Sequence, residues 1–260
     1  MGVTTEPKNA APVSRRQRFD HQRQHGRHRW VVTVVILLLG MLAVGGVWWH
    51  SHQQSVLKAY PIRGVSIDQD DGYIDFHQLQ SAGVKFVYLK ATSGASYIDD
   101  NFSSNYERVS GTTLQVGIYE EFSFSSSAEQ QYRYMVSQIG QQSGNLPIAI
   151  HITDYGKYAS NPPNYEKQGR KLARLVELLS ERYGQGCIIW AGPQIQKKLV
   201  MPHTPGTKRW TITDQLKRQS SQVKFMQYTG NEKLEVGGKK TDLVISVFNG
   251  SRKEWKEEVN

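Results

Sequence analysis

Acidic residues and one histidine lie at or near the ends of short apolar runs in this sequence. Asp68, Glu121 and His151 are the three that could do chemistry from such positions. A facing pair of carboxyl groups can act as general acid and base, and histidine can exchange a proton near neutral pH. Asp68 with Glu121 is therefore the candidate acidic pair, and His151 is the candidate alternative acid.

A structural role competes with each of these assignments. Asp70 and Asp71, which follow Asp68, can form an Asp-Gly turn with the next residue. Glu121 and the glutamate before it can be solvated charges at the rim. His151 can be a buried histidine that is hydrogen-bonded to the threonine two residues on.

Strand and helix patterns alternate along the region that must position these groups. Their alternation predicts a parallel sheet with helices outside, and seven or so strands in about 200 residues favour a TIM-like α/β barrel over an open sheet. In such barrels, functional residues lie at the C-terminal ends of strands. The strand candidates are Ile62–Asp68, Lys85–Ala91, Gln115–Phe122, Leu146–Thr153, Gly186–Ala191, Lys224–Tyr228 and Leu243–Phe248, and the helix candidates are Phe76–Ala82, Phe102–Val109, Ala128–Ile139 and Tyr165–Tyr183.

The N-terminal part has a different composition. Residues 1–29 are polar and Arg-rich, which predicts a disordered cytoplasmic tail. Within residues 30–49, the uncharged run Val31–Trp49 would span about 28 Å as a helix, enough for a bilayer core. Arginines before this run predict a signal anchor with the N-terminus inside, so that a linker at 50–60 and a globular domain at 61–260 lie outside the cell. A cleaved signal peptide is the alternative, although no Ala-x-Ala site follows the run.

Charge and cysteine content exclude some classes of function. The net charge is +9, but +5 of it lies in residues 1–29, and the remainder shows no basic stripe with interleaved aromatic residues. This argues against nucleic-acid binding. A single cysteine, Cys187, excludes an intrachain disulfide. Three histidines of the tail, at 21, 25 and 28, do not make a convincing metal site there, and no metal or cofactor is expected.

Several short motifs follow one another in a fixed order through the globular region. Together they resemble the family 25 glycoside hydrolases, lysozymes that cut peptidoglycan, over about 190 residues. The resemblance implies a barrel with a glycan groove at its mouth. The motifs are Gly64–Asp68 (GVSID), Ile74–Phe76 (IDF), Lys90–Gly94 (KATSG), the series Tyr97, Asp99, Phe102 and Asn105, Gly117–Phe122 (GIYEEF), Gln227-Tyr228 and Phe248–Gly250 (FNG).

The sequence departs from the family pattern where the family has acidic residues. The family's fourth strand ends in an Asp-x-Glu pattern whose Glu is taken to be the general acid. The corresponding positions, and the other acidic positions, are His151 for that Asp, Thr153 for that Glu, Ser66 for the first-strand Asp, Ser93 for the Glu after Lys-Ala-Thr, and Val244 or Asp242 for the C-terminal Asp.

These departures decide the predicted function. Glycoside cleavage needs a proton donor for the leaving oxygen and negative charge near the oxocarbenium, and Thr153 is no useful donor. We therefore expect a membrane-anchored extracellular lysozyme-like domain that is directed at peptidoglycan and is weakly active or non-catalytic. One alternative is an active muramidase that uses relocated carboxylates, Asp68 and Glu121, or His151 as the acid. Another is a platform for protein partners in cell-wall synthesis.

Aromatic residues near the predicted mouth could stack on sugars. Core packing is the competing role for each of them. The candidates for glycan binding are Tyr97, Tyr119, Trp190 and Tyr228. The expected partners are thus the peptidoglycan strand and, through residues 30–49, the membrane.

Overall fold

The computed structural model describes residues 30, 33–49, 57, 59–231 and 233–259. The chain divides into two compact units, Met1–His52 and Gln53–Asn260. In the first unit, residues 33–49 are helical. No helix of the described residues has both the length and the apolar character that crossing a membrane requires. The predicted tail, residues 31–32 of the predicted span and most of the predicted linker lie outside the described residues.

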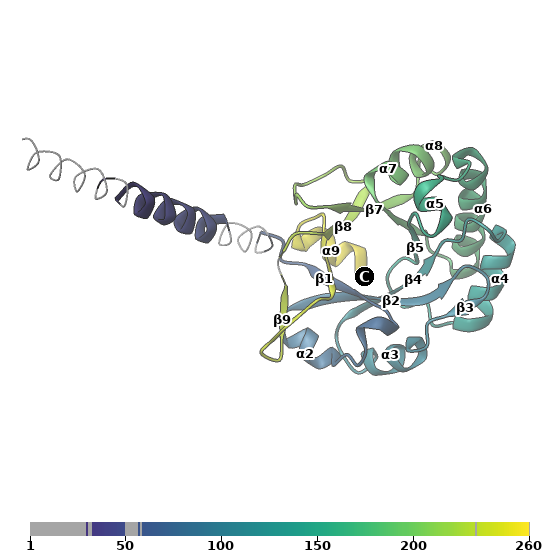
Figure 1. Ribbon diagram of the computed structural model, residues 1–260. Coiled ribbons are helices and arrows are strands. Elements are labelled where there is room, and N and C mark those ends of the chain that lie inside the picture. Colours follow the sequence, from purple (N-terminus) through teal and green to yellow (C-terminus); the bar gives the residue numbers. More distant parts are fainter. Residues whose placement is uncertain (1–29, 31–32, 50–56, 58, 232, 260) are drawn as a thin grey trace, which may run out of the picture. The chain divides into compact units, whose positions relative to one another are not determined.

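The second unit is a closed barrel of eight strands, which confirms the predicted TIM-like architecture (Figure 1). β1 pairs with both β2 and β11, and this double pairing closes the sheet. The short β3 (Tyr97–Ile98) extends the sheet beside β2. The barrel strands are β1 (Arg63–Ile67), β2 (Val84–Ser93), β4 (Gln115–Glu121), β5 (Ala149–Ile152), β6 (Ile188–Ala191), β7 (Lys208–Thr213), β8 (Val223–Tyr228) and β11 (Val244–Phe248).

One strand corrects the expectation of a wholly parallel sheet. β11 runs antiparallel to both of its neighbours, β8 and β1. Among its described residues, the connection from β8 to β11 holds no helix, only the hairpin of β9 (Leu234–Val236) and β10 (Lys239–Thr241). A parallel neighbour needs a long crossover, usually helical, whereas an antiparallel one does not. β7 is a second difference, because its polar sequence KRWTIT was not among the strand candidates.

Four predicted helices are confirmed, and further helical segments were not predicted. The confirmed helices are α2 (Phe76–Ser81), α3 (Phe102–Val109), α4 (Ala128–Ile139) and α6 (Tyr165–Tyr183), and all but α2 have the predicted bounds. Glycine ends α6, where Gly184 adopts the left-handed conformation. The other segments are η1 (Gln69–Asp71), α5 (Lys157–Ser160), the continuous stretch α7 (Pro193–Ile195), η2 (Gln196–Val200) and α8 (Met201–His203), and α9 (Arg252–Val259).

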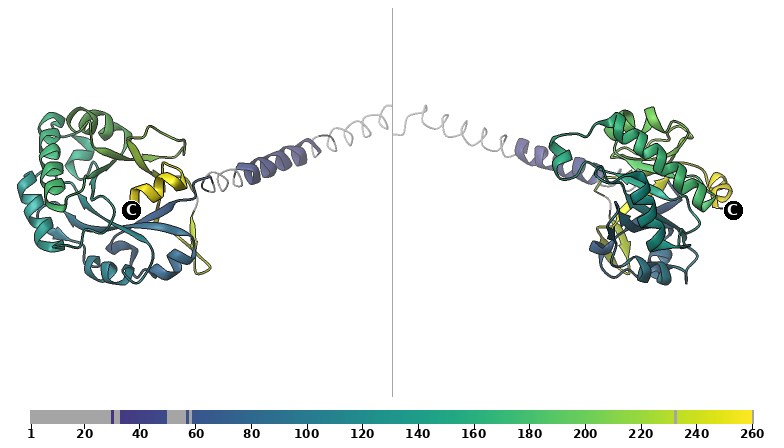
Figure 2. Two further views of the ribbon diagram at one scale, coloured as in Figure 1. Left: turned by 180° about the vertical axis from the view of Figure 1, so that it is seen from behind. Right: turned by 90° about the vertical axis from the view of Figure 1, so that its right-hand side faces the viewer.

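Aromatic rings fill the interior of the barrel. Trp210 is fully buried at the centre, where its ring lies 4.3 Å from that of Trp190 and 4.7 Å from that of Tyr88. Towards the N-terminal ends of the strands, Trp255 of α9 packs 5.1 Å from Phe248 and 5.5 Å from Phe86. α9 therefore closes one end of the barrel, the end that faces the viewer in the left view of Figure 2. The opposite end is the mouth.

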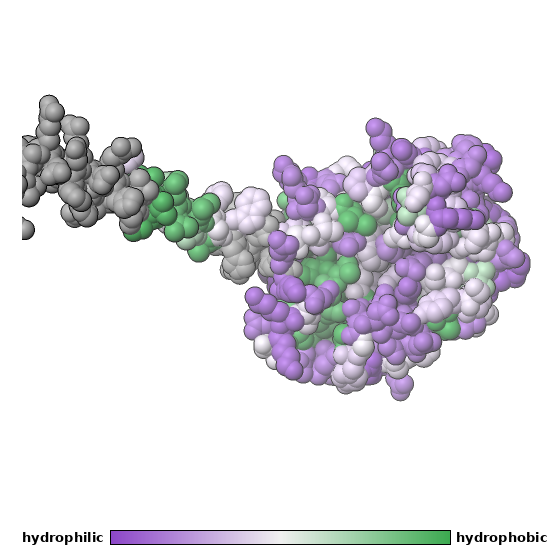
Figure 3. Space-filling model, viewed as in Figure 1, coloured by the Kyte–Doolittle hydropathy of each residue, from purple (hydrophilic) through white to green (hydrophobic). Residues whose placement is uncertain are grey.

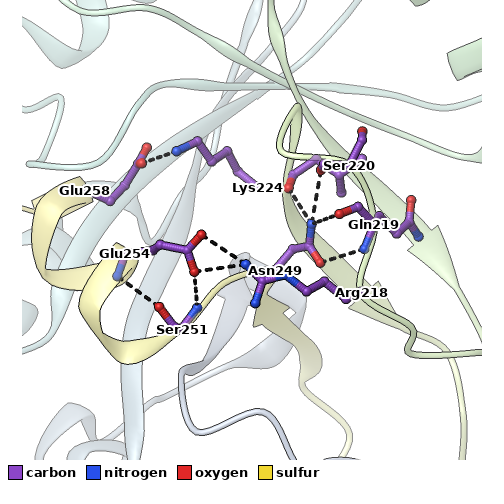
Figure 4. Close-up of polar contacts among 9 residues, drawn as sticks. Arg218, Gln219, Ser220, Lys224, Asn249, Ser251, Glu254 and Glu258 are labelled. Carbon is purple, nitrogen blue, oxygen red and sulfur yellow. Dashed lines mark hydrogen bonds and ion pairs between the residues drawn. The ribbon is translucent and has the colours of Figure 1, made fainter.

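Polar contacts hold α9 in this position (Figure 4). Ser251 and Glu254 bond to each other's backbone amides at the start of the helix, a capping box. Arg218 donates to both oxygens of Glu254 at 3.0 Å, and Lys224 pairs with Glu258. The amide of Asn249, just before the helix, donates to three carbonyl groups of the β7–β8 loop and the start of β8.

Candidate functional site

Strand alternation decides which residues reach the interior of the mouth. On β4, Tyr119 belongs to the interior cluster, so Glu121 also points inward and Glu120 points outward, towards the helices. On β5, His151 points inward by the same alternation, because Ala149 belongs to the interior cluster. The end of β5 and the end of β4 are neighbours, since His151 is in register with Glu121.

A charged pair lies at the centre of the mouth. Nζ of Lys90, from β2, lies 2.9 Å from Oε2 of Glu121. Nδ1 of His151 lies 4.0 Å from Oε1 of the same carboxylate. The side chains of Lys90 and His151 are 13% and 14% exposed, and that of Glu121 is 34% exposed, so the pair is only partly open to water. The structure thus brings together two of the three candidate catalytic residues and adds a lysine to them.

His151 occupies an environment that keeps it neutral. Its ring stacks on Trp190, with the ring centres 3.9 Å apart, and meets Tyr119 edge-on at 6.0 Å. Burial lowers the pKa of His151 to about 4, although the nearby Glu121 carboxylate opposes this shift. Nδ1 has no hydrogen-bond partner among the described residues, so this atom does not make the expected bond to Thr153. At neutral pH the imidazole is therefore a weak proton donor.

Asp68, the third candidate, has a structural role. Its carboxylate accepts from the backbone N–H of Asp70 at 2.9 Å, and Asp71 accepts in return from the N–H of Asp68. This capping box begins η1 and is followed by Gly72 with φ of 68°. The turn expected as the alternative role is thus present. Asp68 nevertheless remains near the mouth, because its charge, like that of Glu121, raises the pKa of Tyr119, which burial raises most.

The structure also shows the surroundings of other positions that the sequence resemblance assigns to the family's acids. Ser66 is 3% exposed, and its Oγ has no hydrogen-bond partner among the described residues. Its register neighbour on β11 is Val244. Asp242, the other position considered for the C-terminal acid, is highly exposed and pairs with Lys233. No described cluster of three or more His, Cys, Asp or Glu side chains is arranged to hold a metal ion.

Glu120 does not lie at the rim. The residue is fully buried on the outer face of β4, and neither carboxylate oxygen has a partner in the described structure. Burial raises the pKa of Glu120 well above its usual value, which favours the neutral, protonated form of the side chain. It faces the helix layer and takes no part in the mouth.

The four aromatic candidates are distributed over three environments. Tyr119 and Trp190 are 5% and 3% exposed and belong to the interior cluster just below the charged pair. Tyr97 is 38% exposed, and the Lys90 ammonium lies 6.0 Å from its ring centre. Tyr228 is 7% exposed and belongs to the outer hydrophobic cluster, not to the interior one. The mouth therefore brings together Tyr97, Tyr119 and Trp190, while Tyr228 packs in the other layer.

Lys90 and Gln227, which belong to the quoted motifs, were not predicted as site residues although both point into the interior. Lys90 continues the alternation of Phe86 and Tyr88 along β2, which places it inward and could have identified it. Gln227 accepts a 2.9 Å hydrogen bond from the indole of Trp190 and fixes that ring. Figure 3 shows that the face presented in Figure 1 is largely hydrophilic, with patches of hydrophobic surface between its hydrophilic edges. With polar groups beside the rings of Tyr97, Tyr119 and Trp190, the mouth can contact both the hydroxyl groups and the apolar faces of a polar ligand.

Comparisons with a family model, with curated proteins and with solved structures all point to the same family. Residues 65–236 match the model of "Glycosyl hydrolases family 25". Among curated proteins, "Uncharacterized protein YegX" of Escherichia coli is 24% identical over 139 residues, which cover 52% of this chain and 49% of that protein. An "N,O-diacetylmuramidase" of Chalaropsis is 27% identical over 126 residues, covering 47% of this chain and 60% of that protein. The first of these matches thus spans about half of the relative's length.

Solved structures share the architecture. A family 25 glycosyl hydrolase from Bacillus anthracis superposes with a TM-score of 0.71 and 29% identity, covering 78% of this chain and 95% of that one. A lysozyme from Streptomyces coelicolor gives a TM-score of 0.62 at 21% identity, covering 76% and 97%, which shows likeness of fold.

Proposed function

The chain belongs to the glycosyl hydrolases family 25, and from this premise we propose that its barrel binds the glycan strands of peptidoglycan and cleaves them weakly or not at all. Support for the substrate comes from the family and from relatives that are muramidases and lysozymes by name. Support for impaired catalysis comes from the mouth itself.

The absence of a proton donor at the family's acid positions carries this proposal. Ser66 and Thr153 have no acidity at physiological pH, and His151 is neutral because its pKa is about 4. Glu121 is already paired with the Lys90 ammonium. A leaving oxygen that receives no proton departs slowly, and general acid catalysis contributes about 10²- to 10⁴-fold. The aromatic groups that could hold a sugar nevertheless remain.

Restoring the acids tests this proposal. We expect the full chain, purified in mild detergent, to release far fewer reducing ends from insoluble peptidoglycan than a working lysozyme does. Thr153→Glu combined with His151→Asp and Ser66→Asp should raise that release by at least about 100-fold, because a donor and negative charge return together. The matched control carries Thr153→Gln in place of Thr153→Glu, together with the same His151→Asp and Ser66→Asp, and should stay inactive. Release by the unaltered chain at lysozyme rates would contradict the proposal.

A second candidate function rests on the position of two carboxylates. The charges of Asp68 and Glu121 both raise the pKa of Tyr119, below the effect of its burial, as do those of Asp99 and Asp71. An active muramidase that uses this relocated pair would lose activity in Asp68→Asn and in Glu121→Gln. If the unaltered chain is active and either substitution abolishes the release of reducing ends, this second function replaces the first.

For the N-terminal part we propose a membrane anchor at residues 30–49, with the N-terminus cytoplasmic and the barrel extracellular. The support comes from the sequence: an uncharged run of 19 residues, preceded by arginines. A barrel tethered in this way would meet the wall from its membrane side. If the chain does not bind peptidoglycan, the alternative function is that of a platform for cell-wall synthesis proteins.

A further inference from the structure

The two ends of the barrel differ in the sign of their charge. At the mouth, the connection from β1 to α2, residues 68–75, holds four aspartates, and the one from β2 to α3, residues 94–101, holds two. Neither connection holds a basic residue. At the opposite end, which α9 closes, five connections that lead into strands contain no charged residue at all. They are residues 82–83, 110–114, 140–148, 184–187 and 204–207.

Exposed basic side chains gather at the end that α9 closes, which we call the basic end. They belong to the start of β7, to the connection from β7 to β8, and to α9 itself. The β7–β8 connection is held against α9, because Arg218 donates to both oxygens of Glu254 (Figure 4). The six exposed basic residues are Lys208, Lys217, Arg218, Arg252, Lys253 and Lys256.

Most of this positive charge is not neutralised within the chain. The three acidic residues of α9 each have one basic partner. The pairs are Arg218 with Glu254, Lys224 with Glu258 and Lys253 with Glu257. Four of the six exposed basic residues take part in no ion pair among the described residues, namely Lys208, Lys217, Arg252 and Lys256. Four cationic groups at one end of the barrel are thus available to an external anionic partner.

The segment that leads back to the proposed anchor reaches the barrel at this same end. Ala59 and Tyr60 line a groove together with Lys217 and Arg218. Burial raises the pKa of Tyr60, and the nearby charge of Arg218 opposes that rise. Nine residues, 50–58, separate the proposed anchor from Ala59, and nine residues reach at most about 30 Å. A barrel on this tether would therefore keep its basic end close to the membrane surface.

We propose that the basic end binds the anionic headgroups of the membrane in which the chain is anchored, so that the mouth faces away from the membrane and towards the wall. The inference rests on the proposed anchor. Each lysine or arginine near an anionic surface adds to the attraction, which falls off within a Debye length. The aspartates of the mouth are repelled by the same surface, so one orientation is favoured over the reverse.

The tether decides between lipid and other anionic partners. A soluble polyanion could pair with the same four cationic groups, but it would have to be recruited from solution. The headgroups are held beside the basic end by the short connection, which raises their effective concentration there. Lipid is therefore the partner that this arrangement favours.

Quenching by lipid headgroups tests the orientation. The full chain is inserted into vesicles whose headgroups carry a nitroxide, and a fluorophore is attached to Ser221→Cys at the basic end or to Ser96→Cys at the mouth. Cys187 does not compete for the label, because burial raises the pKa of its thiol to about 12. With about one third phosphatidylglycerol, the Ser221→Cys label should be quenched at least about threefold more than the other. The difference should vanish in 1 M salt, where the Debye length is about 3 Å.

Neutralising the basic end supplies the matched comparison. The neutralised variant combines Lys217→Gln, Arg252→Gln and Lys256→Gln, and its quenching at Ser221→Cys should fall to the level seen in neutral phosphatidylcholine. The control variant combines Lys157→Gln, Lys167→Gln and Lys197→Gln, exposed lysines on elements that follow the C-terminal ends of β5 and β6. It loses the same charge and should be quenched as the unaltered chain is. If circular dichroism shows that the neutralised variant does not fold, the salt dependence of the unaltered chain decides.

The outcomes separate this inference from the proposed anchor. Equal quenching in anionic and neutral vesicles, or quenching that the neutralised variant retains, would overturn the docking and leave the anchor standing. If the chain does not insert, the anchor fails, and flotation with anionic vesicles decides the docking: the neutralised variant should bind at least about 100-fold more weakly than the control variant. Binding of dextran sulfate by the chain in detergent, with no difference between the vesicle labels, would identify a soluble polyanion as the partner and overturn the proposal.

Discussion

At the scale of single residues, the mouth and the layer behind it hold two titratable groups in unusual states. Burial lowers the pKa of His151 to about 4 and raises the pKa of Glu120 well above its usual value, so it favours the neutral form of both side chains. Nδ1 of His151 and both carboxylate oxygens of Glu120 are buried without a hydrogen-bond partner among the described residues. Because the pKa of each group differs between the folded and the unfolded chain, each makes the free energy of unfolding depend on pH, and a single substitution can test this.

His151 should destabilise the fold in acid. Its pKa is about 4 in the folded chain against 6.5 in an unfolded one, so the unfolded state takes up the proton first as pH falls. The stability it contributes is complete above pH 6.5 and is lost by pH 4, about 3 kcal/mol in all. We expect His151→Gln to lose less stability than the unaltered chain between pH 7 and pH 4 in denaturant titrations. An equal loss in both proteins would contradict this.

Glu120 should act in the opposite direction. Its raised pKa means that the unfolded state loses the proton first, so this residue lowers stability progressively as pH rises above about 4.5. Glu120→Gln should therefore raise the denaturant midpoint at pH 7 and leave it nearly unchanged at pH 4. Glu121→Gln, which breaks the pair with Lys90, is the control and should not stabilise. Stabilisation of equal size at both pH values would exclude the buried charge as the cause.

At the scale of elements, α9 contributes one fully packed side chain to the core, while Val259 packs against it only in part. Trp255 is 7% exposed and packs against interior rings, whereas the rest of the helix is mostly exposed. Trp255→Ala should lower the free energy of unfolding by about 3–5 kcal/mol, as for other large-to-small core substitutions. Lys253→Ala on the same helix should change it by less than about 0.5 kcal/mol. Denaturant unfolding of both variants measures the difference.

The elements also show how far the sequence could predict this fold. Helices α4 and α6 were predicted with their bounds, because apolar periodicity and glycine stops coincide there. Strand β7 was not predicted, because its sequence is mostly polar and offers a single large interior ring, Trp210. Helix α9 was not predicted either, although Ser251 and Glu254 have the spacing of a capping box. The barrel was predictable, whereas the antiparallel β11 depends on a connection that no local pattern reveals.

The candidate site was predictable only in part. Glu121 and His151 were each predicted at a strand end near the mouth, but the predicted pair was Asp68 with Glu121, and the 4.0 Å approach of His151 to Glu121 was not predicted. The ion pair of Lys90 with Glu121 and the stacking of His151 on Trp190 both depend on the sheet register. Asp68 was assigned to chemistry, but its carboxylate caps a turn. Short-range hydrogen bonds of this kind compete with catalytic roles for the same side chain.

At the scale of the whole molecule, the proposed anchor makes a prediction about location. The full chain should remain with membranes after an alkaline carbonate wash, and protease added to intact cells should remove the barrel. Leu38→Lys with Leu42→Lys should release the chain from the membrane, because each central lysine opposes insertion by about 2.5–3.5 kcal/mol. Full protection of the barrel from external protease would contradict the proposed orientation.

The pairing of β1 with β11 joins the first and last strands of the barrel. A chain synthesised from its N-terminus therefore exposes the free edges of β1 and β8 until the last strand has emerged, and α9 can cap the aromatic interior only after that. Loss of even the last few dozen residues would leave two unpaired backbone edges, which favour association between chains. A premature stop codon near the 3′ end should thus produce aggregates and not a shortened, working domain.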